Sequence, residues 1–240
     1  MDFVSTEHQF NDFPQALQGY QVMNNEECKQ KLLDALDNKS SCVKFRDRQE
    51  YLPTCHNMVT TMHVKSSLKK IDLAKVARCT GNSSYDRKRF AAITLRIDNP
   101  KTTALLFSSG KVVITGATSR QMSIYAARGI IKMLRRLFPD DEFEQTCFAI
   151  QNIVSNVSIP NVSEIDVKRM YQEHASHTTY QPSIFPGLIF RPSGSPVVLL
   201  IFKSSRIVVT GAKRYEDVYS GFKNVLDDIK KYFVYDTPAT

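Results

Sequence analysis

Two asparagines, four phenylalanines and four basic side chains recur in this 240-residue sequence at a constant spacing of 95 residues. An amide side chain donates hydrogen bonds, a phenylalanine ring offers apolar contact area, and arginine or lysine binds anions. These residue types predict a binding surface. The repeated pairs are Asn57 and Asn152, Phe90 and Phe185, Phe107 and Phe202, Arg96 and Arg191, and Lys111 and Arg206.

Motifs for enzyme chemistry are weak in comparison. His174 and His177 flank a helix-like stretch with Glu173, which is a poor zinc motif, and Ser109-Gly110-Lys111 lacks the spacing of a phosphate-binding loop. The sequence contains no G-x-S-x-G. The five cysteines are scattered and none forms C-x-x-C, so we expect reduced, packed thiols in a reducing compartment. We therefore predict that the protein is not an enzyme and holds no metal and no cofactor.

The repeat extends over long segments without a gap. Residues 89–118 align with residues 184–213, and 56–60 align with 151–155, at the same spacing. Two tandem copies are most simply two halves related by approximate twofold symmetry. We predict a first repeat over 51–145 and a second over 146–240. The acidic leader, 1–50, has no counterpart; a short helix through Leu36 is an alternative to the favoured mobile segment.

Each copy predicts the same order of elements. A strand around Asn57 or Asn152 is followed by a short helix, by strands separated by turn residues, and by a longer helix. The short helices are expected near Leu68–Lys75 and Ile165–Arg169, and the longer ones over Ser119–Leu137 and Glu216–Phe233. Hairpins dominate, so the fold class is α+β with an antiparallel sheet.

Several of these strands are apolar on both faces, as in Val112-Val113-Ile114 and Leu199-Leu200-Ile201-Phe202. Two long helices can cover only one face of the sheet, so the other face is a partner surface, unless a second sheet or a homodimer buries it. Its alternate positions are apolar or uncharged, with basic residues at the edges. This composition suits a widened minor groove of DNA. The uncharged positions are Asn57, Val59, Leu105, Phe107, Val113 and Thr115, with Asn152, Val154, Leu200, Phe202, Val208 and Thr210.

The formal net charge of +8 is unevenly distributed. Residues 1–50 have a net charge of −3, and residues 51–240 have +11. A basic body is typical of a protein that binds nucleic acid or an anionic membrane, although charge alone leaves a merely soluble basic protein open. No apolar run is long enough to span a bilayer, and the N-terminus does not resemble a secretory signal. We therefore expect no membrane partner.

The repeated blocks ALLFSSGKVVITGA and LLIFKSSRIVVTGA, each with an upstream phenylalanine and arginine, resemble the saddle-shaped core of the TATA-box-binding protein family. The resemblance extends from about Thr54 to Phe233. It implies a saddle of two tandem pseudo-symmetric repeats, a curved antiparallel sheet with two long helices on its convex face. It also implies minor-groove binding and kinking of A·T-rich promoter DNA, and a general role in transcription initiation.

The resemblance implies a role for each repeated residue. The two phenylalanine pairs would insert between bases, with Ala91 and Pro186 adding contact. Asn57 and Asn152 would donate hydrogen bonds beside Thr115 and Thr210. The apolar positions would line the groove floor. The phosphate contacts would come from Arg96, Lys111, Arg191, Arg206, Lys88 and Arg89.

The resemblance further implies a nuclear protein that contacts initiation factors A and B and TATA-binding-protein-associated factors. It would be a monomer on DNA and a weak homodimer when free. The expected protein-partner residues are Arg128, Lys132, Arg136, Gln181, Ser183 and Ile184. Residues 180–184 lack the family's acidic pair, which puts the factor B contact in question. The alternative is a paralogue that acts mainly as a protein-interaction platform with altered DNA specificity.

Overall fold

The structure is a computed structural model that describes residues 51–235. The chain divides into two units, Met1–Gln49 and Glu50–Thr240, and the described residues all belong to the second. The helix or mobile segment expected within 1–50 therefore lies outside the described residues.

The two repeats share one order of elements, to which the second repeat adds two short strands that form a sheet of their own. The first comprises β1 (Thr54–Ser66), α2 (Leu73–Cys79), β2 (Ser83–Ser84), β3 (Ala92–Ile97), β4 (Thr102–Phe107), β5 (Lys111–Ala117) and α3 (Arg120–Leu137). The second comprises β6 (Phe143–Ser158), β7 (Val162–Ile165), α4 (Val167–Glu173), β8 (Thr178–Thr179), β9 (Leu188–Phe190), β10 (Val198–Ile201), β11 (Arg206–Ala212), α5 (Tyr215–Lys230) and β12 (Phe233–Tyr235). The expected boundary at 145/146 falls within β6, and the exact limits of the repeats stay a prediction.

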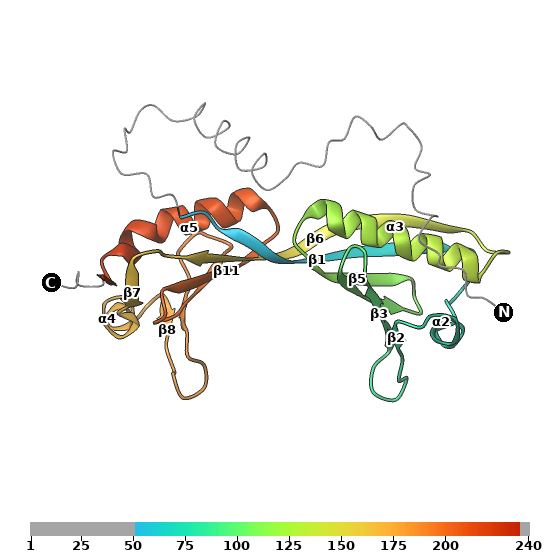
Figure 1. The fold of residues 1–240 in the computed structure, drawn as a ribbon, viewed down its shortest axis with the longest axis horizontal. Coiled ribbons are helices and arrows are strands. Elements are labelled where there is room, and N and C mark those ends of the chain that lie inside the picture. The colour runs from blue at the N-terminus through green and yellow to red at the C-terminus, as the bar shows by residue number, and fades with distance from the viewer. Residues whose placement is uncertain (1–50, 236–240) are drawn as a thin grey trace, which may run out of the picture. The chain divides into compact units, whose positions relative to one another are not determined.

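Ten of these strands form one antiparallel sheet in the order β2-β3-β4-β5-β1-β6-β11-β10-β9-β8. The two halves of this order mirror each other, with β1 and β6 paired at the centre. Figure 1 shows α3 and α5 on one side of the sheet, whereas the β2–β3 and β8–β9 loops project from the other side. The predicted fold class, α+β with two tandem repeats and a curved antiparallel sheet, is confirmed.

Alternate residues of the sheet face different environments. Met58, Leu106 and Ile114 are fully buried under the helices, but their sequence neighbours on the opposite face are only half-buried. The alternation follows from the period of two in a strand. Two hydrophobic cores lie against the sheet, one under each long helix, so the strands need apolar side chains on the helix side. Their apolar side chains on the other face have no covering layer among the described residues.

The long helices begin close to their predicted starts. The Ser119 side chain accepts a hydrogen bond from the Met122 backbone N–H (3.2 Å) and caps α3, which buries Ala126, Ile130 and Leu134. Helix α5 buries Phe222 and Ile229.

Three predicted helix limits were wrong. Helix α5 ends at Lys230, and Phe233 lies in β12, because its backbone pairs with Ile165 of β7. Helix α2 begins only at Leu73, since the Asp72 carboxylate caps the backbone N–H groups of Ala74 and Lys75 at 2.9 and 3.0 Å. The segment from Leu68 to Asp72 therefore precedes that helix. In the second repeat, Ile165 belongs to β7 and the helix begins at Val167.

Candidate nucleic-acid interface

The uncovered face of the sheet, which we call the open face, has the two repeated asparagines at its centre. The Asn57 side-chain oxygen accepts hydrogen bonds from the Gly116 backbone N–H (2.8 Å) and the Thr115 hydroxyl (3.1 Å). Gly116 has a φ of 89°, which favours glycine. Because the carbonyl end of the amide is held by the protein, its nitrogen is left as a hydrogen-bond donor for the open face.

The second repeat reproduces this arrangement. The Asn152 side-chain oxygen accepts from the Gly211 backbone N–H (2.9 Å), and its amide nitrogen donates to the Thr210 hydroxyl (3.1 Å). Gly211 has a φ of 98°. Both asparagines and both threonines were predicted from the sequence. The structure brings Asn57 together with Thr115, and Asn152 together with Thr210.

The apolar residues of the open face surround these amides. Leu105 pairs with Val113 across β4 and β5, and Leu200 pairs with Val208 across β10 and β11. The six apolar side chains are all half-buried, so each presents part of its surface to solvent. They form one apolar floor, composed of Val59, Leu105, Val113, Val154, Leu200 and Val208.

Each end of the floor has a phenylalanine pair. The rings of Phe90 and Phe107 lie 6.0 Å apart between centroids at 65°, and those of Phe185 and Phe202 lie 5.7 Å apart at 66°. Both arrangements are edge-to-face contacts, which are favourable for aromatic rings. The Phe90 side chain is 48% exposed although it is large and apolar. Ala91 and Pro186 are exposed beside these pairs.

Sequence reasoning missed one residue of this site, Gly187. It is buried, and a Cβ atom there would lie 2.8 Å from Phe185 Cε1 and 3.0 Å from Phe202 Cε1. The sequence could have identified Gly187 by comparison with Ala92, its counterpart in the first repeat. Each follows the first phenylalanine of a repeated pair by two positions, and only the second repeat has glycine there.

Exposed basic residues border the face. Arg96 lies in β3, Lys111 begins β5, Arg206 begins β11, and Arg191 follows β9. Lys88 and Arg89 lie in the β2–β3 loop. Arg89 Nε is 3.5 Å from Asp86 Oδ2, and both side chains are well exposed, so solvent weakens this ion pair.

The predicted protein-partner residues lie elsewhere. Arg128, Lys132 and Arg136 are exposed along α3, and the first two line a shallow pocket with Glu144 and Gln145 of β6. Arg135, between them, donates two hydrogen bonds to the Phe143 backbone oxygen, at 3.1 and 2.7 Å. The other predicted partner residues, Gln181, Ser183 and Ile184, are exposed in the β8–β9 loop, and 80% of the Ile184 surface is accessible. The structure thus places these two sets on different parts of the second unit. The loop set comprises Gln181, Ser183 and Ile184.

The weak zinc motif has a structural role. Glu173 accepts a hydrogen bond from the Tyr232 hydroxyl (2.6 Å) and pairs with Arg169 Nε (2.8 Å). Burial, and then this bond to Glu173, raises the pKa of Tyr232 to about 12. Within residues 51–235, no group of three or more His, Cys, Asp or Glu side chains could hold a metal ion.

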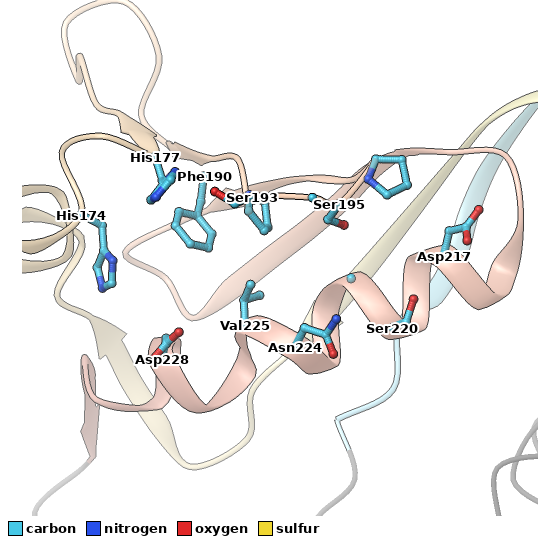
Figure 2. A pocket seen from close by; sticks show the side chains of 14 residues that line it. His174, His177, Phe190, Ser193, Ser195, Asp217, Ser220, Asn224, Val225 and Asp228 are labelled. Carbon is cyan, nitrogen blue, oxygen red and sulfur yellow. The ribbon is translucent and has the colours of Figure 1, made fainter. Parts of the chain in front are cut away.

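His174 and His177 instead line a polar pocket of about 480 Å³ between α5 and the loop after β9 (Figure 2). The His174 ring contacts Phe190 and Tyr232 edge-on, each at 5.9 Å between centroids. Among the described residues, no helix is both long and apolar enough for a membrane span.

Comparisons with known proteins agree with this geometry. The family model described as "Transcription factor TFIID (or TATA-binding protein, TBP)" matches residues 53–137 and 147–232, one segment in each repeat. The TATA-box-binding protein of Dictyostelium discoideum is 43% identical over 174 residues, covering 72% of this chain and 82% of that protein. TATA-box-binding protein 2 of Arabidopsis thaliana is 39% identical over 181 residues, covering 75% and 87%.

A solved structure, Methanococcus jannaschii TBP, superposes with a TM-score of 0.62 at 30% sequence identity. The match covers 75% of this chain and 99% of that one. Together, these likenesses confirm the resemblance that the repeated blocks predicted.

Proposed function

Because the chain belongs to the TATA-box-binding protein family, we propose that its open face binds the minor groove of double-stranded, A·T-rich promoter DNA and starts assembly of the transcription-initiation complex. The observation that supports this best is the uncovered apolar floor between two phenylalanine pairs and exposed basic residues. The family consists of DNA-binding transcription factors rather than enzymes. The proposed function needs no cofactor.

The central amides select A·T pairs. Adenine N3 and thymine O2 are acceptors in the minor groove, whereas guanine adds an amino donor there. Asn57 and Asn152 have their oxygens occupied by backbone N–H groups, and each amide still has an N–H to donate, because Asn152 uses only one of its two for Thr210. A donor facing a guanine amino group would leave both groups unpaired, so G·C pairs are disfavoured.

The phenylalanine pairs insert at the two ends of the site and unstack a base step there. Full burial of an exposed phenylalanine contributes roughly 1.5–3 kcal/mol, and because these four are already about half-buried, covering the rest contributes about 3–6 kcal/mol in all. Unstacking two steps costs about a few kcal/mol each, and bending adds roughly 1–6 kcal/mol. These costs are at least as large as the gain, so easily unstacked TA steps and phosphate contacts decide the affinity.

The basic residues neutralise phosphates on both sides of the groove. Arg96 and Arg191 correspond between repeats, as do Lys111 and Arg206, so contacts fall symmetrically about the centre. Each neutralised phosphate releases counterions, which makes the affinity fall steeply with salt.

Partner contacts lie outside the open face. We propose that the α3 stripe of Arg128, Lys132 and Arg136 binds initiation factor A, and that associated factors contact the same unit of a nuclear protein. The protein would be a monomer on DNA and a weak homodimer when free, because its apolar floor would otherwise face water. The β8–β9 loop has no acidic side chain near Pro182, so the contact to factor B would be made by Ile184 and its neighbours.

One observation supports the alternative, an interaction platform with altered DNA specificity. Ile184 is a large apolar side chain at 80% exposure in a loop without acidic residues, which favours a protein partner different from that of the family's acidic loop. In this alternative, DNA binding would be weak or altered.

Fluorescence anisotropy separates the two functions. A short duplex containing TATAAA and a matched G·C-rich duplex are titrated at several salt concentrations. Strong preference for the TATAAA duplex with a steep salt slope is the result expected of minor-groove recognition. Equal, weak binding to both duplexes would refute the proposal and favour the interaction platform.

A further inference from the structure

We infer that Gly187 positions the Phe185–Phe202 pair, and that this glycine makes the two ends of the open face unequal toward DNA. The inference rests on the proposed function and extends it from what is bound to how the bound DNA is oriented. Gly187 acts through the two rings, so it is a positioning residue.

The room above Gly187 is occupied by the rings. A Cβ atom on this residue would lie 2.8 Å from Phe185 Cε1, and 3.0 and 3.2 Å from Phe202 Cε1 and Cζ. Carbon atoms at optimal contact are about 3.5–4.0 Å apart, so any side chain here would displace both rings. The strand register agrees, because Leu188 pairs with Ile201 and the next pair outward brings Gly187 opposite Phe202.

The backbone does not require a glycine at this position. Among the described glycines, those with positive φ are Gly110, Gly116, Gly194 and Gly211, and Gly187 is not one of them. An L-residue could adopt the backbone conformation of Gly187. The space for the rings is therefore the feature that only glycine provides.

The first repeat has a different residue in the same place. Ala92 corresponds to Gly187, is 2% exposed, and pairs directly with Phe107 across β3 and β4. With this methyl group beneath them, the first pair of rings is 6.0 Å apart and Phe90 is 48% exposed. The second pair is 5.7 Å apart, and Phe185 is half-buried.

The two pairs therefore meet DNA differently. The leading ring of the first pair, Phe90, is 48% exposed, whereas its counterpart Phe185 is half-buried, so the first pair offers more ring surface to a base step. A site such as TATAAA also has unequal ends, because its steps differ in how easily they unstack. Matching unequal protein ends to unequal DNA ends favours one of the two orientations on the pseudo-symmetric open face.

The first experiment tests, in the free protein, whether Gly187 sets the positions of the Phe185 and Phe202 rings. Fluorine NMR of protein labelled with 4-fluorophenylalanine reports the surroundings of each ring, with signals assigned from single Phe→Leu variants. In Gly187→Ala the signals of Phe185 and Phe202 should shift, while those of Phe90 and Phe107 stay. Ala92→Gly is the matched control and should shift the first pair alone. Unchanged Phe185 and Phe202 signals in Gly187→Ala would overturn the inference.

The second experiment measures orientation on DNA. A dye on the exposed thiol of Cys79 in the first repeat is paired with a dye at one end of a TATAAA duplex, and single-molecule energy transfer counts the two orientations. The other accessible cysteines are replaced by serine. Burial raises the pKa of the Cys55 thiol, which slows its labelling. The wild type should show one predominant orientation.

Gly187→Ala should shift the orientation ratio toward equality by about fivefold, and the double exchange Ala92→Gly with Gly187→Ala should shift it further in the same direction. Lower affinity with an unchanged ratio would show a merely structural role and overturn the inference. A wild type that binds TATAAA and G·C-rich duplexes equally would instead refute the proposed function, while the fluorine spectra would still decide whether Gly187 seats the rings.

Discussion

Val59 of β1 lies opposite Asn152 of β6 at the centre of the sheet, and the reciprocal pair, Asn57 and Val154, lies beside it. Each repeat thus places its amide next to the valine of the other repeat. The centre of the open face therefore belongs to both repeats, and neither repeat forms it alone. The two amides are the first target for a test of base selection.

Replacing Asn152 by Asp should weaken binding to the TATAAA duplex by about 1–3 kcal/mol. The carboxylate can still accept the hydrogen bond from the Gly211 backbone N–H, but it removes the donor and places an acceptor against base acceptors. Anisotropy titration measures the loss. Asn224→Asp, on exposed α5, adds the same charge away from the open face and serves as the control. Equal affinities of both variants would contradict the role of the amide.

Phe202→Ala should abolish kinking of the duplex while the protein stays folded. This side chain is half-buried on the open face and supports no covering layer there. Energy transfer between dyes at the two duplex ends reports the bend. The control is Phe222→Ala on the buried face of α5, where the side chain is 1% exposed; this change should lower stability by about 3–5 kcal/mol. A folded Phe202→Ala protein that still bends DNA fully would refute the wedge assignment.

Arg206→Ala should reduce the slope of log affinity against log salt by about one, with a uniform loss for all sequences. Its guanidinium is exposed at the start of β11 beside the apolar floor. Titrations at four or more salt concentrations give the slope. Arg128→Ala removes the same charge from α3, which packs against the opposite face of the sheet, and should leave the slope nearly unchanged. Equal salt slopes for the Arg206→Ala and Arg128→Ala variants would contradict a phosphate contact by Arg206.

Gly211→Ala should lower the free energy of unfolding by about 1–3 kcal/mol, because φ is 98° and a Cβ atom would lie 2.8 Å from the Pro196 backbone oxygen. Gly129→Ala should raise it by about 0.5–1 kcal/mol, since this glycine lies in α3 with open space around it. Denaturant titration measures both. The two Gly→Ala substitutions should therefore change the free energy of unfolding in opposite directions. Changes in the same direction would contradict the backbone roles assigned to these glycines.

The Tyr232 hydroxyl should make stability depend on pH in the alkaline range. Burial and the bond to Glu173 raise the pKa of Tyr232 to about 12, above the ordinary value of about 10. A raised pKa means that the contribution is complete below pH about 10 and is lost as the pH rises through about 12. Tyr232→Phe should lose part of this dependence in alkaline unfolding experiments. Tyr235→Phe, at a side chain that is 58% exposed, should behave like the wild type.

Much of the fold follows from local patterns in the sequence. The spacing of 95 residues predicts two equivalent halves, and the apolar positions of 119–137 predict a helix observed at Arg120–Leu137. Strands that are apolar on both faces predict an uncovered surface, because two helices cannot cover both sides of one sheet. The repeated asparagines and phenylalanines were identifiable for the same reason, since repetition in register singles out positions that an isolated motif would not.

Contacts between distant residues decided the rest. Helix α5 ends before Phe233 because that residue pairs with β7, about 70 positions earlier in the chain, and an apolar periodicity cannot distinguish a helix face from a strand that follows it. The direction of the Asn57 and Asn152 amides depends on two glycine N–H groups almost 60 residues away. The need for glycine at position 187 depends on where the Phe185 and Phe202 rings pack. The sequence by itself determined which side chains recur and at what period, whereas tertiary packing decided which atoms remain available, because hydrogen-bond partners and ring positions are set by strands that meet only in the folded sheet.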